Sequence, residues 1–304
     1  MSSDKSDQLD FTTRLNCPIC EGHSIKLGCK RGRYIQREFS LRECLNCTYT
    51  FIENPCVSFD RIYDENYYRA KGADPLTNYV FEFEHPDISI RVHEFRGIIE
   101  SVGSVVGALA DKSWLDFGSG GGGLVRHLNA VAPEAKFVAG FDEGWMADEA
   151  RRHGIAILRN SELDDLHGSF DVVSAIEVLE HVLDPVETLS SIRKLLKPGG
   201  LFYYTTGNSA PFRKNMLEWS YVTPEIHVGF FNPKSVSAAL ERAGFEVQPA
   251  LYTPGFDKII KFKILKNLGF WRDSWIFDLV PWSAVSKLVD MKYRLSDLPL
   301  AVAR

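Results

Sequence analysis

Long apolar stretches are missing from this sequence of 304 residues. No run reaches the roughly 18 apolar residues that a membrane-spanning helix needs. The first ten residues, MSSDKSDQLD, also lack the hydrophobic centre of a signal peptide. These two absences argue against a membrane-spanning or secreted protein, and the sequence therefore predicts a cytoplasmic one.

An excess of positive charge is also missing. Lysine and arginine number 35 against 40 aspartates and glutamates, which gives a formal net charge of −5 and a pI near 5.9. A chain whose main task is to neutralise nucleic-acid phosphates is usually basic. The charge balance therefore argues against nucleic acid as a partner and favours a small or carrier-bound acceptor molecule. Nothing in the sequence indicates an oligomeric state.

Four of the six cysteines form two CxxC pairs, CPIC and CLNC, with 23 residues between the pairs. Each pair can turn tightly and present two thiolates to one ion, and four thiolates satisfy tetrahedral zinc. Disulfides rarely persist in a reducing cytoplasm, which favours zinc over crosslinks. The predicted zinc ligands are Cys17, Cys20, Cys44 and Cys47, while Cys29 and Cys56 lie outside the pattern.

Between the two pairs, apolar and polar residues alternate around Gly28 and Gly32, which predicts a short antiparallel hairpin. The hairpin and the two CxxC turns are typical of a zinc ribbon, and a ribbon this small needs its metal to fold. An aromatic linker and a helix follow. The linker's aromatic side chains either cover a substrate as a lid or form a hydrophobic seam between two domains.

From Ser113 onward, strands alternate with helices, which is the pattern of a parallel sheet with helices on both faces. The stretch SWLDFGSGGGGLVRHL predicts a strand, a glycine-rich turn and an amphipathic helix. Such a turn lets the backbone approach a ligand, but dinucleotide-binding enzymes use a similar one. The next strand ends in Asp142, about 20 residues after the turn, where a carboxylate can accept both hydroxyls of a ribose.

Asp116, at the end of the first strand, and the later turn KPGG distinguish between the two kinds of cofactor. Together with the glycines they resemble the class I S-adenosylmethionine-dependent methyltransferases over about residues 105–304. The resemblance implies a Rossmann-like α/β fold, a seven-stranded sheet with helices on both faces, preceded here by the small zinc ribbon. It assigns the binding of S-adenosyl-L-methionine to Asp116, Gly118, Ser119, Gly120, Gly122, Asp142, Glu143, Asn160, Ser161 and Glu177, with Glu162 as a further candidate near the adenine.

The whole chain also resembles ribbon-bearing bacterial methyltransferases of polysaccharide or secondary-metabolite pathways. AALERAGFEV followed by ALYTPG matches that group's last helix and sixth strand, and SDLPLAVAR matches a seventh strand inserted antiparallel at the sheet edge. The predicted domains are the zinc ribbon, 1–58, the linker and helix, 59–104, and the methyltransferase domain, 105–304, with a helical insertion at about 255–290. The insertion's Trp271, Trp275, Phe277 and Trp282 either line an apolar substrate site or pack on the sheet.

The predicted fourth strand, FDVVSAI, ends just before Glu177, Glu180 and His181. Ligands of open α/β sheets bind at this end of the strands, and a helical turn here would place the three side chains on one face. His181 can act as a general base, since imidazole titrates near neutrality. Alternatively, the three side chains bind a divalent ion such as magnesium that lowers the pKa of a substrate hydroxyl. The third reading is a structural or positioning role alone.

The EVLEH motif resembles the ubiquinone-pathway O-methyltransferases and the small-RNA 2′-O-methyltransferases, in which Glu-x-x-Glu-His joins a downstream histidine as metal ligands. By that resemblance, His227 is the downstream histidine, and the candidate catalytic residues are Glu177, His181 and His227. The sequence thus predicts an enzyme that methylates a hydroxyl of a sugar, a phenol or another metabolite. Sugar C-methylation, RNA methylation and a non-catalytic cofactor-binding or interaction module stay open as alternatives.

Overall fold

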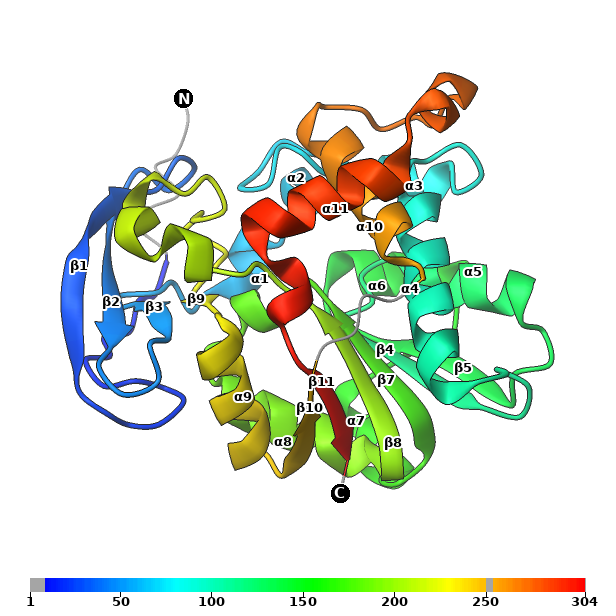
Figure 1. Cartoon of the computed structure of the whole chain (residues 1–304), viewed down its shortest axis with the longest axis horizontal. Helices are drawn as coiled ribbons and strands as arrows, with labels where there is room; N and C mark the ends of the chain where they lie inside the picture. Colours follow the sequence, from blue (N-terminus) through cyan, green and yellow to red (C-terminus); the bar gives the residue numbers. More distant parts are fainter. Residues whose placement is uncertain (1–8, 250–253, 304) are drawn as a thin grey trace.

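The computed structural model describes residues 9–249 and 254–303. Two β-sheets organise these residues, one of four strands and one of seven strands. The small sheet, with its N-terminal strands in blue, lies to one side of the molecule, and the C-terminal helices, in orange and red, lie beyond one end of the large sheet (Figure 1). None of the helices in the described residues is long and apolar enough to cross a membrane.

The large sheet has the strand order β10-β11-β8-β7-β4-β5-β6. Strands β8, β7, β4, β5 and β6 pair in parallel, and β11 is antiparallel to both of its neighbours. The predicted fold class is therefore confirmed. The strands are β4 (Ser113–Phe117), β5 (Phe137–Phe141), β6 (Ile157–Leu158), β7 (Phe170–Ile176), β8 (Leu196–Thr205), β10 (Phe245–Gln248) and β11 (Leu300–Ala303).

One detail of the predicted sheet is wrong. The strand from SDLPLAVAR is antiparallel as predicted, but it lies between β8 and β10, and β10 is the edge strand. In this position β11 forms backbone hydrogen bonds with a strand on each side, β8 and β10. A strand at the edge would leave the backbone groups of one side without a partner strand. Residues 250–253 of the predicted ALYTPG segment lie outside the described residues.

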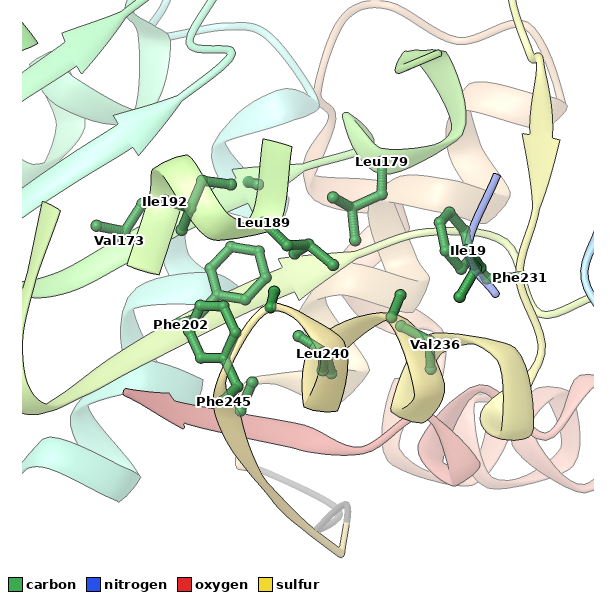
Figure 2. Packing of buried hydrophobic residues seen from close by; sticks show 14 of the residues in the cluster. Ile19, Val173, Leu179, Leu189, Ile192, Phe202, Phe231, Val236, Leu240 and Phe245 are labelled. Carbon is green, nitrogen blue, oxygen red and sulfur yellow. The ribbon is translucent and has the colours of Figure 1, made fainter. Parts of the chain in front are cut away.

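Alternate side chains of the strands point to opposite faces of the sheet, as the strand period requires. One face is covered by α8 (Pro185–Leu195) and α9 (Pro233–Arg242), where Leu189 and Leu240 pack near Phe202 (Figure 2). The other face is covered by α4 (Arg91–Val106), α5 (Gly123–Val131) and α6 (Trp145–Arg152). The short α7 (Asn160–Leu163) follows β6.

Sequence signals fix where the two helices on the first face begin. Asp184 caps α8 by accepting a hydrogen bond from the Glu187 amide, and Pro185 occupies the first turn, where its missing N–H costs nothing. Asn232 caps α9 in the same way, and Pro233 follows it. These caps place α8 and α9 directly after segments that also carry the candidate site residues.

The small sheet consists of β1 (Ser24–Arg31), β2 (Glu38–Cys44), β3 (Thr50–Ile52) and β9 (Gly229–Phe230). Strands β1 and β2 form the predicted antiparallel hairpin. The sequence did not indicate that β9, which follows the candidate residue His227, pairs with β3. The ribbon also contributes Ile19 to the same buried cluster as Phe231, next to α9 (Figure 2). The ribbon and the large sheet therefore share a continuous core.

The aromatic segment forms three short helices, α1 (Phe59–Ile62), α2 (Glu65–Tyr68) and α3 (Tyr79–Glu84). Its tyrosines pack on one another, with Tyr67 in contact with Tyr63, Tyr68 and Tyr79 at ring-centroid distances of 4.8 to 5.8 Å. The same four tyrosines also face the large cavity described below. The segment therefore forms an aromatic cluster that is also part of the cavity wall, and its role as a lid over a substrate stays a prediction.

The C-terminal insertion consists of α10 (Phe256–Asn267), a 3₁₀ helix (Trp275–Leu279) and α11 (Trp282–Tyr293). Helix α10 packs closely on α4, and Gly97 allows this close approach. A Cβ atom at position 97 would lie 2.5 Å from the Gly255 carbonyl oxygen. Phe277 is buried beside Phe262, whereas Trp275 is 73% exposed. None of the four aromatic residues considered for a substrate site lines the cavity: Trp271, Trp275, Phe277 and Trp282.

Candidate active site

A cavity of about 1460 Å³ lies at the carboxyl ends of the parallel strands. The end of β4, the turns after β5 and β7, and the end of β8 all contribute to its wall. The aromatic segment and helix α10 complete the wall. This is where ligands bind in open α/β sheets.

The glycine-rich turn after β4 takes a conformation that glycine suits. Gly118, Gly120 and Gly122 have φ values of 77°, 53° and 69°, in the left-handed region that other residues rarely adopt. A Cβ on Gly120 would meet nothing within 4 Å, whereas one on Gly118 would clash with Val178 at 2.5 Å. The turn therefore presents bare backbone to the cavity at Gly120. The Ser119 hydroxyl is buried and has no hydrogen-bond partner among the described residues.

Two carboxylates flank this turn. Asp116 is 5% exposed, accepts a hydrogen bond of 2.7 Å from Ser174, and has its pKa raised by burial to about 7. Asp142 accepts hydrogen bonds from the amides of Gly120 and Glu143, at 2.6 and 2.7 Å. Burial raises the pKa of Asp142 to about 6. Both carboxylates line the cavity, where a cationic amine or a ribose could use them.

The remaining predicted cofactor residues lie further out. Glu143 lines the cavity and accepts a hydrogen bond of 2.9 Å from the Asn160 amide. Asn160, Ser161 and Glu162 are exposed at the start of α7, and none of them lines the cavity. The structure therefore brings Asp116, Gly118, Ser119, Gly120, Asp142 and Glu143 together at the cavity, whereas Gly122, Asn160, Ser161 and Glu162 do not line it.

Glu177 follows β7 with a φ of 54°, in the left-handed region, which is a strained conformation for a side chain of this kind. Its amide donates to the Thr205 carbonyl oxygen, and its carboxylate lies 2.8 Å from the Lys263 ammonium and 3.2 Å from the Tyr221 hydroxyl. Burial alone would raise the pKa of Glu177, but the Lys263 charge lowers it to about 2. Glu177 therefore faces α10 and does not join the metal-capable cluster described next.

Glu180, His181 and His227 offer one ligand atom each, and these atoms lie within 4.8 Å of one another. Glu180 and His181 come from a 3₁₀ turn (Leu179–His181), and His227 comes from the segment before β9. The spacing within EVLEH thus puts only Glu180 and His181 into the cluster. The third member, His227, is distant in the sequence and reaches the cluster through the fold.

The tautomers of both histidines follow from their backbone contacts. His181 Nδ1 lies 3.0 Å from the Ile226 carbonyl oxygen, and His227 Nδ1 lies 2.6 Å from the Tyr221 carbonyl oxygen. A carbonyl oxygen can only accept, so each Nδ1 carries a proton and each Nε2 keeps its lone pair. Burial, followed by the neighbouring His227, lowers the pKa of His181 to about 3, and burial lowers the pKa of His227. Both imidazoles are therefore neutral, the form in which histidine binds a cation.

Glu180 is fully buried, and hydrogen bonds fix both of its carboxylate oxygens. Thr206 donates to one oxygen at 2.9 Å, and the Tyr221 hydroxyl donates to the other. Burial, followed by the charge of Glu177, raises the pKa of Glu180 to about 8. Such second partners orient ligating carboxylates in metal sites. No sequence motif marks Thr206 or Tyr221. Tyr63, whose hydroxyl lies 2.9 Å from His181 Nδ1, belongs to the aromatic segment for which the sequence predicts only a lid or a seam.

The four predicted zinc ligands converge in the ribbon. The Sγ atoms of Cys17 and Cys47 are 3.5 Å apart, those of Cys20 and Cys44 are 3.4 Å apart, and all four lie within 4.8 Å of one another. A tetrahedron of sulfur atoms about 2.3 Å from zinc has edges of about 3.8 Å. The thiol cluster therefore fits a zinc ion. Cys29 is exposed and Cys56 is buried elsewhere, outside the cluster.

The strand order with an antiparallel β11, the glycine-rich turn after β4 and the carboxylate after β5 define an S-adenosylmethionine-dependent methyltransferase of class I. Comparison with known proteins agrees. The sequence model of a family described as "Methyltransferase domain" matches residues 91–250. The chain belongs to this family.

Curated relatives point the same way. The ubiquinone biosynthesis O-methyltransferase of Pseudomonas aeruginosa is 32% identical over 158 residues, which are 46% of this chain and 67% of the relative. The enzyme of the same name from Saccharophagus degradans is also 32% identical over 158 residues, covering 46% of this chain and 66% of the relative.

Two solved structures are similar at a lower level. A Haloferax volcanii complex of the Trm112 methyltransferase activator with a methyltransferase matches with a TM-score of 0.47 and 18% identity, covering 70% of this chain and 92% of that one. Human N-acetylserotonin methyltransferase matches with a TM-score of 0.46 and 18% identity, covering 62% of this chain and 54% of that one.

Proposed function

We propose that this methyltransferase transfers the methyl group of S-adenosylmethionine to a hydroxyl oxygen of a small or carrier-bound metabolite, and that a divalent cation held by Glu180, His181 and His227 assists the transfer. The observation that carries this proposal is the convergence of those three side chains on the cavity that also holds the glycine-rich turn. Two neutral imidazoles and one carboxylate suit a divalent ion.

The chemistry needs a deprotonated oxygen next to the methyl carbon. A divalent ion in the cluster would lower the pKa of a neighbouring hydroxyl and orient it. The acceptor oxygen bonds to the methyl carbon as the carbon–sulfur bond breaks, S-adenosylhomocysteine leaves and the hydroxyl proton passes to solvent. The protein holds both partners in place, because Thr206 and Tyr221 fix Glu180 while the backbone carbonyls fix the two histidines.

The cavity wall indicates the class of acceptor. Phe212 and Trp219 stack with ring centroids 4.5 Å apart, and Trp219 stacks on Tyr221 at 4.8 Å. All three rings line the cavity, and Tyr221 also donates to Glu180. Flat aromatic surfaces suit the faces of phenolic rings and of sugars. The named activity of the relatives, O-methylation in ubiquinone biosynthesis, supports a phenolic hydroxyl.

A panel of acceptors tests the proposal. Catechols, sugar nucleotides and a short RNA are each incubated with S-adenosylmethionine, with and without magnesium or manganese. We expect methyl transfer to oxygen of a catechol or a sugar that falls on mild chelation and returns with the divalent ion. Methylation of RNA, or transfer to a sugar carbon, would contradict the proposed acceptor chemistry. Failure to bind S-adenosylhomocysteine would support the non-catalytic interaction module.

A second mechanism has its own observation. The Tyr63 hydroxyl lies 2.9 Å from His181 Nδ1, beside the Ile226 carbonyl oxygen, and both contacts suit a proton on Nδ1. The lone pair on His181 Nε2 could then accept the proton of a substrate hydroxyl without a metal ion. Nitrogen chemical shifts of His181 test this tautomer, because a proton on Nε2 would leave no lone pair there for either role. Full activity after complete removal of divalent ions from the cavity would favour this base mechanism.

For the ribbon we propose a structural zinc ion held by Cys17, Cys20, Cys44 and Cys47. The support is the spacing of the sulfur atoms and the burial of three of the four cysteines. Such an ion would stabilise the turns that carry the pairs and, through β3 and β9, the segment that holds His227.

A further inference from the structure

Helix α10, outside the residues that the family's sequence model matches, contributes two lysines to the cavity wall, Lys263 and Lys266, and Lys263 is the one that contacts buried carboxylates. Lys263 is 24% exposed, and its ammonium lies 2.8 Å from Glu177 and 3.5 Å from Glu94. Burial alone would lower the pKa of Lys263, but the two glutamates raise it, so the side chain stays charged. A charged lysine thus stands in the wall of the cofactor cavity.

Glu94, on α4, is the second unusual group. Its side chain is 0% exposed and lines the cavity. One oxygen lies 2.5 Å from Arg91, while the other, Oε1, accepts no hydrogen bond within the part of the chain that the structure describes. A buried carboxylate oxygen without a hydrogen bond is costly and calls for a donor. Glu94 also lies close enough to Asp116 to affect its pKa.

We infer that Glu94 and Lys263 recognise the amino-acid end of S-adenosylmethionine. The methionine ammonium donates to Glu94 Oε1, alongside Asp116, and the methionine carboxylate pairs with Lys263. Lys263 then lies between Glu177 and the methionine carboxylate, and the methionine ammonium pairs with Glu94. The donor that Glu94 Oε1 lacks is supplied by the ligand.

The other cations of the cavity wall are Arg33, Arg91, Arg126 and Lys266. Arg91 is held between Glu82 and Glu94, at 3.0 and 2.5 Å. Arg126 donates to the Phe83 carbonyl oxygen and lies over the Phe83 ring. Among the described residues, Arg33 and Lys266 form no ion pair with Glu94, so Lys263 alone of the five cations lies next to Glu94 Oε1. The inference rests on the S-adenosylmethionine dependence of the enzyme and is independent of the proposed metal ion.

Two ligands separate this role from a structural one. S-Adenosylhomocysteine carries the amino-acid end, whereas 5′-methylthioadenosine shares the nucleoside and lacks both the ammonium and the carboxylate. Titration calorimetry of the full chain measures both affinities. In Lys263→Gln we expect binding of S-adenosylhomocysteine to weaken at least about 10-fold, the effect of losing a charged hydrogen bond. The affinity for methylthioadenosine should change less than about 2-fold, because this ligand does not contact Lys263 and the substitution leaves the nucleoside site intact.

Three further variants complete the test. Lys263→Arg keeps the charge and should retain S-adenosylhomocysteine binding, and Glu94→Gln should weaken that ligand alone. Lys258→Gln is the control, because Lys258 lies on the same helix but pairs with Glu100, outside the cavity wall. Equal weakening of both ligands in Lys263→Gln, or none, would overturn the inference. If Lys263→Gln does not fold, Lys263→Met takes its place with the same two outcomes.

Discussion

The amide of Val228 donates a hydrogen bond of 2.7 Å to the carbonyl oxygen of Glu180. This bond joins the segment that carries His227 to the turn that carries His181. Arg14, from the ribbon, reinforces the junction by donating to the carbonyl oxygens of Leu183 and Val228, at 2.6 and 3.3 Å. The N-terminal ribbon therefore helps to position the proposed metal ligands.

The first prediction concerns this junction. Arg14→Gln should weaken divalent-ion binding at the cluster by about 10–100-fold, the range for loss of a partner that orients ligands. Binding of S-adenosylhomocysteine should stay unchanged, because Arg14 does not line the cavity. Manganese titration followed by electron paramagnetic resonance measures the first effect. Arg31→Gln, an exposed change on β1, is the control and should bind manganese like the parent.

The ribbon zinc gives the second prediction. Metal analysis of the purified chain should find about one zinc per chain, as one four-thiolate site requires. A Cys17→Ser, Cys44→Ser double variant should lose that zinc, whereas Cys29→Ser, an exposed cysteine outside the cluster, should keep it. Zinc that persists in the double variant would show that the four thiols are not its ligands.

Asp142 carries the third prediction. Asp142→Ala should weaken S-adenosylhomocysteine binding by about 1–3 kcal/mol, because a half-buried acceptor for a ribose and for the Gly120 amide is lost. Calorimetry measures the change. Asp165→Ala, an exposed carboxylate away from the cavity, is the matched control. Equal affinities in the parent and in Asp142→Ala would mean that the ribose binds elsewhere.

The pH dependence of cofactor binding is the fourth prediction. Burial raises the pKa of Asp116 to about 7, so the free enzyme takes up a proton there as the pH falls. The ligand's ammonium favours the ionised carboxylate, so binding releases that proton and weakens at low pH. Between pH 7.5 and 5.5 the affinity should fall about 20-fold by proton linkage. Asp142, with a pKa of about 6, adds to the fall in the same direction. Calorimetry in buffers of different ionisation enthalpy should detect the released proton, and a flat profile would contradict a role for Asp116.

Local patterns predicted much of this structure, and distant contacts explain what they missed. The two CxxC pairs, the glycine-rich turn and Asp142 are each marked by short-range spacing, so their positions followed from the sequence. The pairing of β9 with β3 joins residues about 180 positions apart, and no local pattern reports such a pairing. The position of Lys263 could not be predicted from local sequence either, because the packing of α10 on α4 brings it to Glu177.

The EVLEH motif shows the same limit on a smaller scale. A regular helical turn would have put Glu177, Glu180 and His181 on one face. The left-handed conformation of Glu177 instead turns its carboxylate toward Lys263, and His227 joins the cluster with Glu180 and His181. Sequence spacing indicated the right residues but could not decide which of them share one ion.

The account depends most on a divalent ion at Glu180, His181 and His227, and one measurement tests it directly. Manganese binding to the zinc-loaded enzyme is followed by electron paramagnetic resonance, for the parent and for His181→Ala and His227→Ala. The structure predicts one bound manganese ion in the parent, with loss of binding in both variants while S-adenosylhomocysteine still binds. Manganese that binds both variants as tightly as the parent, or no binding to the parent, would contradict the proposed site.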